Sequence, residues 1–132
     1  MASIRFWNPD GIAPPSSRFS HAALTTGATR HLHLSGQVGA APDGRIAEGL
    51  EAQLDAAFAN VATGLAAAGM TQANLIKLVV YLVSAAPDAV ASYRQRRDVW
   101  VGDGPAPAAT LLIVAGLANP AWLVEVDAYA AD

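Results

Sequence analysis

The chain has 132 residues, close to the modal size of one protein domain, so a single domain over residues 1–132 is expected. Hydrophobic residues make up 53% of the chain and charged residues 14%, which excludes intrinsic disorder. The net charge of −3 argues against a protein that binds nucleic acid by neutralising phosphates. So few charges on a small chain also predict self-association, because the cores of protein interfaces are depleted of charge.

The chain contains no cysteine, which excludes disulfides, thiolate catalysis and Cys-based metal sites. Its first residues have no apolar signal-peptide core. The longest apolar run, Leu78–Val83, is far shorter than the ~20 residues of a membrane-spanning helix. We therefore expect a cytoplasmic protein without a membrane partner. No motif in the sequence indicates a cofactor-binding site, so no cofactor is expected.

The first third of the chain is expected to form strands. Hydrophobic and polar residues alternate strictly at 31–35, which predicts a strand near this segment, and Phe19–Thr25 predicts another. Gly27 marks a turn between them. Together these features predict a β-hairpin with its tip at 26–30. Upstream, a short strand near Ile4–Trp7 is expected.

Residues 49–68 give the clearest helical pattern. Apolar residues at helical spacing predict one buried stripe, formed by Leu50, Leu54, Phe58, Val61 and Leu65. Gly69 follows the last of these residues and predicts the end of the helix.

The sequence after residue 74 predicts three strands and a second helix. The apolar run at 75–83 predicts a strand buried on both faces. Pro87 starts a helix over 88–101, and further strands are expected at 108–114 and 123–129. The order β-β-β-α-β-α-β-β predicts an α+β fold in which one sheet carries both helices on one face. The other face would be buried in an oligomer.

Several segments resemble the RidA/YjgF family in order and spacing. They are Ser35-Gly36-Gln37, Gln53 with Asn60-Val61, Leu75 to Leu82, Pro107-Ala108 and Val124 to Ala128. The resemblance covers about Ser16 to Ala130 and rests on this order rather than on one specific motif. It implies a chorismate-mutase-like fold and a homotrimer with small-molecule clefts between subunits.

The resemblance also implies an activity, the hydrolysis of reactive enamines and imines such as 2-aminoacrylate to 2-keto acids and ammonia. The family's arginine, a bidentate clamp for the substrate carboxylate, corresponds to Ala109. We therefore expect weak turnover of 2-aminoacrylate, improved by Ala109→Arg. The alternative is that Arg18 or Arg97 of a neighbouring subunit supplies the clamp.

The resemblance implies that Glu125 is the catalytic carboxylate, which positions water or moves protons. Two structural alternatives stay open for Glu125, a hydrogen-bonded interface carboxylate and an exposed strand residue. The candidate substrate-binding residues are Phe19, His21, Ser35, Gly36, Ala109, Leu111 and Trp122. Phe19 stands where the family often has a tyrosine, so a hydroxyl is missing there as well.

Two further clusters have simpler interpretations. His31 and His33 share one strand face, but no third ligand is evident, so no metal site is expected. Arg94, Arg96 and Arg97 are interpreted as a solvated helix face that pairs with Asp98 or Asp88.

Two functions follow from these observations. The first is an imine or enamine hydrolase that uses Glu125 and works without the usual clamp. The second is a non-catalytic trimer that holds a small metabolite, which the apolar side chains of Ala109 and Leu111 favour. A ribonuclease is disfavoured by the acidic net charge.

Overall fold

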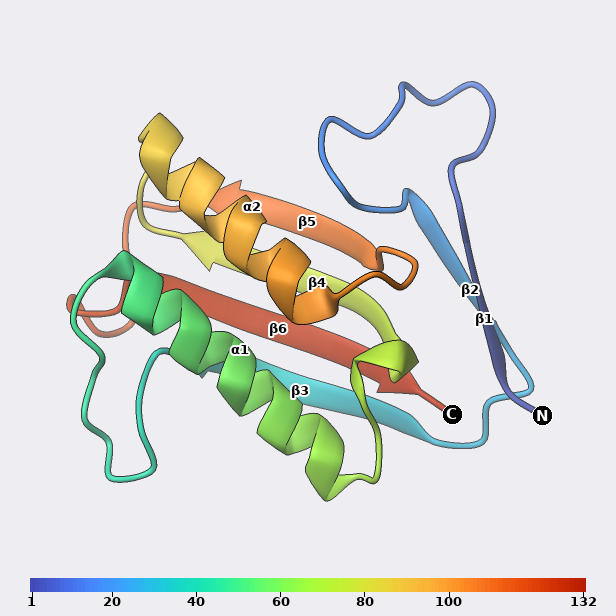
Figure 1. The fold of residues 1–132 in the computed structure, drawn as a ribbon, viewed down its shortest axis with the longest axis horizontal. Coiled ribbons are helices and arrows are strands. Elements are labelled where there is room, and N and C mark those ends of the chain that lie inside the picture. The colour runs from blue at the N-terminus through green and yellow to red at the C-terminus, as the bar shows by residue number, and fades with distance from the viewer.

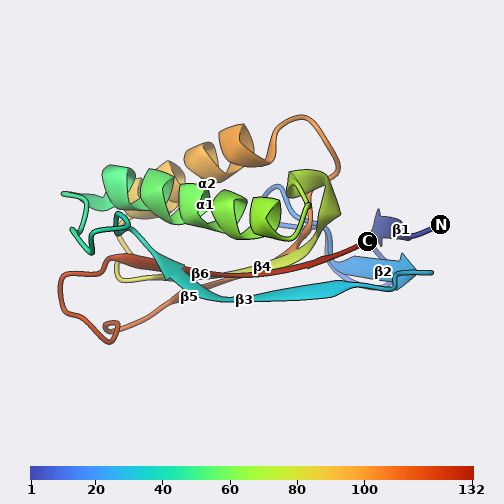
Figure 2. The ribbon, with the colours of Figure 1, turned by 90° about the horizontal axis from the view of Figure 1, so that it is seen from below.

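The computed structural model describes all residues, 1–132, and contains a four-stranded sheet, a two-stranded ribbon and two long helices. In chain order the elements are β1 (Ser3–Trp7), β2 (Ala22–Thr26), β3 (His31–Val38), α1 (Leu50–Ala67), a short 3₁₀ helix (Gln72–Asn74), β4 (Leu75–Leu82), α2 (Pro87–Val101), β5 (Ala108–Ile113) and β6 (Val124–Ala131). Both long helices lie on the same face of the sheet (Figures 1 and 2). The predicted α+β fold with its helices on one face is confirmed.

The four-stranded sheet has the order β3-β6-β4-β5. The pair β4–β5 is parallel, whereas β3–β6 and β4–β6 are antiparallel. A parallel pair needs a long crossover, and α2 provides it between β4 and β5. Strand β5 lies at one edge of the sheet, behind α2 in the view of Figure 1.

The core lies between the helices and the sheet. The stripe predicted for α1 is confirmed for Leu54, Phe58, Val61 and Leu65, which are at most 1% exposed, whereas Leu50 at the start of the helix is only half-buried against the core. The ring of Phe58 stacks on Trp100 of α2 at a centroid distance of 4.9 Å, which joins the two helices. No helix of the structure combines the length and hydrophobicity that a membrane crossing requires.

The predicted hairpin of Phe19–Thr25 with the strand at 31–35 is wrong. Strand β2 pairs with β1, while β3 pairs with β6 in the main sheet. The backbone N–H groups of Thr29 and Arg30 donate to the carbonyl oxygen of Asp132, so the connection is held by the end of the chain. Alternation identifies a strand but not its partner, and in the structure Leu32 and Leu34 of β3 pack against the core while the strand pairs with β6.

The prediction that the strand at 75–83 is buried on both faces is also wrong for the single chain. Residues of β4 alternate between buried and half-buried, because the helices cover only one face of the sheet. We call the uncovered side the open face. Its side chains include Lys77, Val79 and Tyr81 of β4 and their partners Tyr129 and Asp127 of β6.

Candidate functional site

A cavity of about 300 Å³ lies on the helix side of the sheet, where α2, β5 and the segment 16–19 meet. We call it the α2–β5 cavity. It is lined by Ser16, Ser17, Phe19, Tyr93, Arg94, Arg97, Ala109 and Leu111. Three of the predicted substrate-binding residues, Phe19, Ala109 and Leu111, are therefore brought together.

The strand register explains why Ala109 and Leu111 face this cavity. They pair with Leu78 and Val80 of β4, which are both fully buried toward the helices. Paired residues of neighbouring strands share a face, so Ala109 and Leu111 point toward α2. Tyr93 lies above them on α2, and both Tyr93 and Arg97 are buried residues of that helix.

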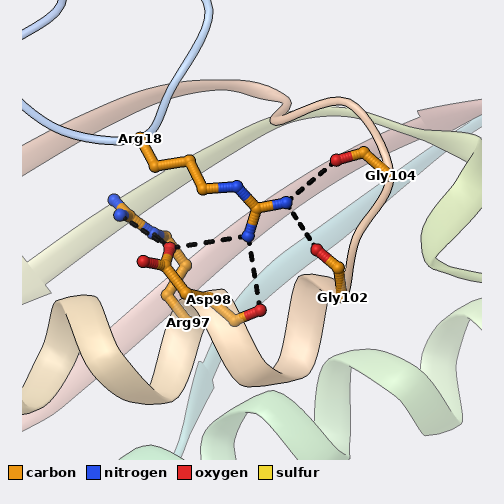
Figure 3. Close-up of polar contacts among 5 residues, drawn as sticks. All are labelled: Arg18, Arg97, Asp98, Gly102 and Gly104. Atoms are coloured by element: carbon orange, nitrogen blue, oxygen red, sulfur yellow. Dashed lines mark hydrogen bonds and ion pairs between the residues drawn. The ribbon is translucent and has the colours of Figure 1, made fainter.

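The segment that carries Phe19 is fixed to the end of α2 by Arg18 (Figure 3). The Arg18 guanidinium donates to the carbonyl oxygens of Gly102 and Gly104, the latter at 2.9 Å. A cation at the C-terminal end of a helix also interacts favourably with the helix dipole. The backbone N–H of Ser20 donates to Pro107 at 3.1 Å, which ties the same segment to the start of β5.

The charges around the cavity are predominantly positive. Arg97 is 4% exposed, and its Nε donates to Oδ1 of Asp98 at 2.9 Å. Nη1 of Arg18 lies 3.8 Å from the same oxygen, so one carboxylate serves two guanidinium groups (Figure 3). Arg94 lines the cavity without an ion pair, and no Asp or Glu lines it.

The predicted solvated face of three arginines on α2 is thus only partly present. Arg97 is buried, and Arg96 forms ion pairs with Glu51 and Asp55 of α1 rather than with a neighbour on its own helix. Burial raises the pKa of the Tyr93 phenol, and the positive charge of Arg97 partly offsets this increase. The cavity therefore presents a neutral phenol beside a buried cation.

Glu125 lies on the open face, on the opposite side of the sheet. A Cβ atom at Gly36 would come within 2.0 Å of Glu125 Oε1, so only glycine leaves room for this carboxylate against β3. The β3–β6 register shifts between Leu34 and Gln37, a bulge that contains Ser35 and Gly36. The structure thus brings together three predicted residues, Ser35, Gly36 and Glu125.

Tyr81 and Asp127 lie beside Glu125 on the open face. Tyr81 pairs with Glu125 across β4 and β6, and its hydroxyl donates to Asp127 Oδ2 at 3.1 Å. This hydrogen bond raises the pKa of Tyr81, and the negative charges of Asp127 and Glu125 add to the effect. The open face therefore carries two carboxylates close to one phenol.

His21 and Trp122 lie outside both groups. The Nε2 atom of His21 is 2.6 Å from the Ala13 carbonyl oxygen, and its ring meets Phe19 edge-on. Trp122 belongs to the turn before β6, where its N–H donates to Asn119. No three His, Asp or Glu side chains gather closely enough to hold a metal ion.

Tyr93 was not predicted to belong to the site, and Arg97 was predicted to lie on a solvated face, with a clamp supplied to a neighbouring subunit as the alternative. A signal for both was present, because Val90, Tyr93, Arg97 and Trp100 fall on one stripe of the helix. An arginine on an otherwise apolar stripe indicates a buried cation, which needs a specific partner.

The chain matches known proteins over nearly its whole length. Residues 11–132 match the family model described as endoribonuclease L-PSP. The solved structure of YyfB from Yersinia pestis, a Rid-family protein of unknown function, is 30% identical with a TM-score of 0.88, covering 97% of this chain and 98% of that one. A YjgF-family protein of Neisseria meningitidis is 29% identical with a TM-score of 0.68, covering 98% and 94% of the two chains.

A more distant structure shares the fold. TdcF of Escherichia coli, solved with bound serine, is 22% identical with a TM-score of 0.71, covering 95% of this chain and 93% of that one. No curated protein matches the chain. The match to the family model and the likeness to YyfB together show that the chain belongs to the endoribonuclease L-PSP family, whose members include the RidA and YjgF proteins.

Proposed function

We propose that the protein is a small-molecule hydrolase of the Rid type, which converts an imine or enamine to a carbonyl compound and ammonia in clefts between the subunits of a homotrimer. The observation that carries this proposal is the division of the candidate residues between two faces. Phe19, Ala109 and Leu111 line the α2–β5 cavity, whereas Glu125 and Gly36 lie on the open face. Within one chain the sheet separates the two groups, so a complete site needs a second copy.

Each half of the proposed site supplies what the other lacks. The cavity offers a volume of about 300 Å³, an apolar wall and hydroxyl groups, but no carboxylate or imidazole that moves protons at neutral pH. The open face offers Glu125 without an enclosed pocket. When the open face of one copy covers the cavity of the next, an acid/base group meets a bound ligand in a site that is enclosed but still admits the one water molecule the reaction consumes.

The proposed reaction needs one proton shuttle. An enamine takes a proton at carbon to give an iminium ion, and water then adds to the C=N carbon. Glu125 accepts a proton from this water and returns it to the nitrogen. The C–N bond then breaks as the new hydroxyl group loses its proton to form the C=O, so ammonia leaves and the proton taken up at carbon is given back. The carbonyl product and ammonia together account for the imine and the water.

The second candidate is a non-catalytic trimer that only holds the ligand. The absence of Asp, Glu and His from the cavity lining favours it. Ammonia release from freshly generated 2-aminoacrylate, and from a panel of imines of other amino acids, separates the two functions. Release above the rate in buffer supports the hydrolase, whereas ligand binding without release from any imine supports the second candidate.

We expect the protein to be a homotrimer in solution. No helix covers the open face of the four-stranded sheet. Leu112 of the edge strand β5, which pairs with Tyr81, is 38% exposed there. Sedimentation equilibrium or light scattering at micromolar concentration measures the mass directly. A stable monomer under these conditions would contradict both the trimer and the shared site.

A further inference from the structure

Arg97 has the properties of a binding group that is held ready for an anion. It is 4% exposed and lines the α2–β5 cavity, where the small side chain of Ala109 lies on the opposite wall. A buried guanidinium is unfavourable unless its charge is compensated. Here the compensation is incomplete, because the one carboxylate close to Arg97 also pairs with Arg18.

The hydrogen bonds of Arg97 leave one edge of the guanidinium free. Its Nε donates to Asp98 Oδ1, and Nη2 lies 2.9 Å from the same oxygen. The Nη1 atom makes no hydrogen bond of ordinary length within the chain and keeps some exposed surface, although the guanidinium also interacts with the Tyr93 phenol. A guanidinium can bind a carboxylate with two parallel hydrogen bonds either through Nε and Nη2 or through Nη1 and Nη2, and in Arg97 the Nη1–Nη2 edge is the one that Asp98 does not occupy.

Asp98 and Arg18 hold this edge in place. Asp98 fixes the Nε side of Arg97, and Arg18 holds Asp98 while also donating to the last carbonyl groups of α2 (Figure 3). Arg97 also lies over the ring of Tyr93, with its Cζ 5.3 Å from the ring centroid. These contacts restrict the side chain before any ligand arrives, which lowers the entropy that binding must overcome.

We infer that Arg97, through its free Nη1–Nη2 edge, binds the carboxylate of a small ligand in the α2–β5 cavity. This inference rests on the proposed function, because it assumes that the cavity is the ligand site. The apolar side chains of Phe19, Ala109 and Leu111 then accept a short aliphatic substituent on the ligand. The preferred ligands are therefore small 2-oxo or 2-imino acids rather than their neutral analogues.

Calorimetric titration with 2-oxobutanoate and with neutral 2-oxobutanamide tests this inference. The parent protein is expected to bind the acid more tightly than the amide. Arg97→Gln should weaken binding of the acid by about tenfold or more, in line with the loss of charge-assisted hydrogen bonds, and should leave binding of the amide unchanged. Arg94→Gln, which removes an exposed cation of the same cavity, is the matched control and should have a much smaller effect.

Two further variants separate the loss of a binding group from a loss of folding. Arg97→Lys keeps the charge beside Asp98 but lacks the planar fork, so it should fold and bind the acid several-fold more weakly than the parent. Adding Ala109→Arg to Arg97→Gln returns a guanidinium to the cavity and should restore the preference for the acid over the amide. A restored preference for the acid supports the inference. A double variant that binds acid and amide with the same ratio of affinities as Arg97→Gln counts against it.

The possible failures are distinguishable. In one outcome the parent binds both probes, and the variants Arg97→Gln and Arg97→Lys bind them equally well. Arg97 is then not the carboxylate-binding residue, while the cavity remains the ligand site. Equal weakening of both probes in folded Arg97→Lys also overturns the inference. If the parent binds neither probe, both the inference and the proposed small-molecule site are wrong.

Discussion

Replacing Glu125 by Ala is expected to leave the proposed trimer folded and to reduce the proposed imine hydrolysis by roughly 10²–10⁴-fold, the usual contribution of one general acid/base. Glu125 is half-buried on the open face, and its carboxylate lies against Gly36 without a hydrogen bond to another side chain. Its removal therefore breaks no contact on which the fold depends. The measurement is ammonia release per subunit, with the mass of the assembly checked on the same sample.

Asp127→Asn is the matched control for this variant, because Asp127 is a carboxylate on the same face of the same strand. It should keep most of the activity, while the pKa of Tyr81 returns toward its ordinary value once the charge of Asp127 is gone.

Gly36→Ala should fold and lose activity, since the new Cβ would displace the Glu125 carboxylate. If Glu125→Ala hydrolyses imines at the parental rate, the catalytic role is refuted, and if it cannot assemble, the carboxylate is structural.

Gln53→Leu is expected to destabilise the protein by roughly 3–5 kcal/mol, because it leaves several buried polar groups without partners. Gln53 is 2% exposed, and its amide donates to the carbonyl oxygens of Ala47 and Ala121 at 3.1 and 3.0 Å. Its oxygen accepts from the N–H of Leu123 at 2.8 Å. These bonds tie α1 to the turn that leads into β6, and thereby to the strand that carries Glu125.

The measurement for Gln53→Leu is denaturant unfolding, together with a thermal scan in which Tm should fall by about 10 °C or more. Gln95→Leu makes the same chemical change on the exposed side of α2 and should stay within about 0.5 kcal/mol of the parent. Equal stability of the two variants would show that the Gln53 hydrogen bonds contribute nothing net.

Local patterns in the sequence were sufficient for most elements of this fold. The apolar stripe of α1 and the alternation in β3 each follow from the burial of one face, which a short window of sequence records. Strand pairing depends on contacts between distant residues, so the partner of β3 was not predictable from its own residues. The hydrogen bond between Thr29 and Asp132, which are about a hundred residues apart in the sequence, has no local signature.

The candidate site was predictable as a set of residues but not as an arrangement. The resemblance named Phe19, Ala109 and Leu111 together with Glu125, and only the register of β5 and β6 reveals that they face opposite sides of the sheet. The buried state of Arg97 was missed because arginine is normally read as a surface residue. Its place on the apolar stripe of α2 was the available signal.

A subunit-mixing experiment tests the central claim, that each site combines the cavity of one copy with Glu125 of another. Ala109→Trp, which fills the cavity, and Glu125→Ala should each be inactive alone. When the two chains are co-expressed and mixed trimers are purified through two different tags, about one in three sites of each mixed trimer pairs an intact cavity with an intact Glu125. The account predicts that imine hydrolysis returns to about this fraction of the parental rate. Mixed trimers as inactive as the single variants would contradict it.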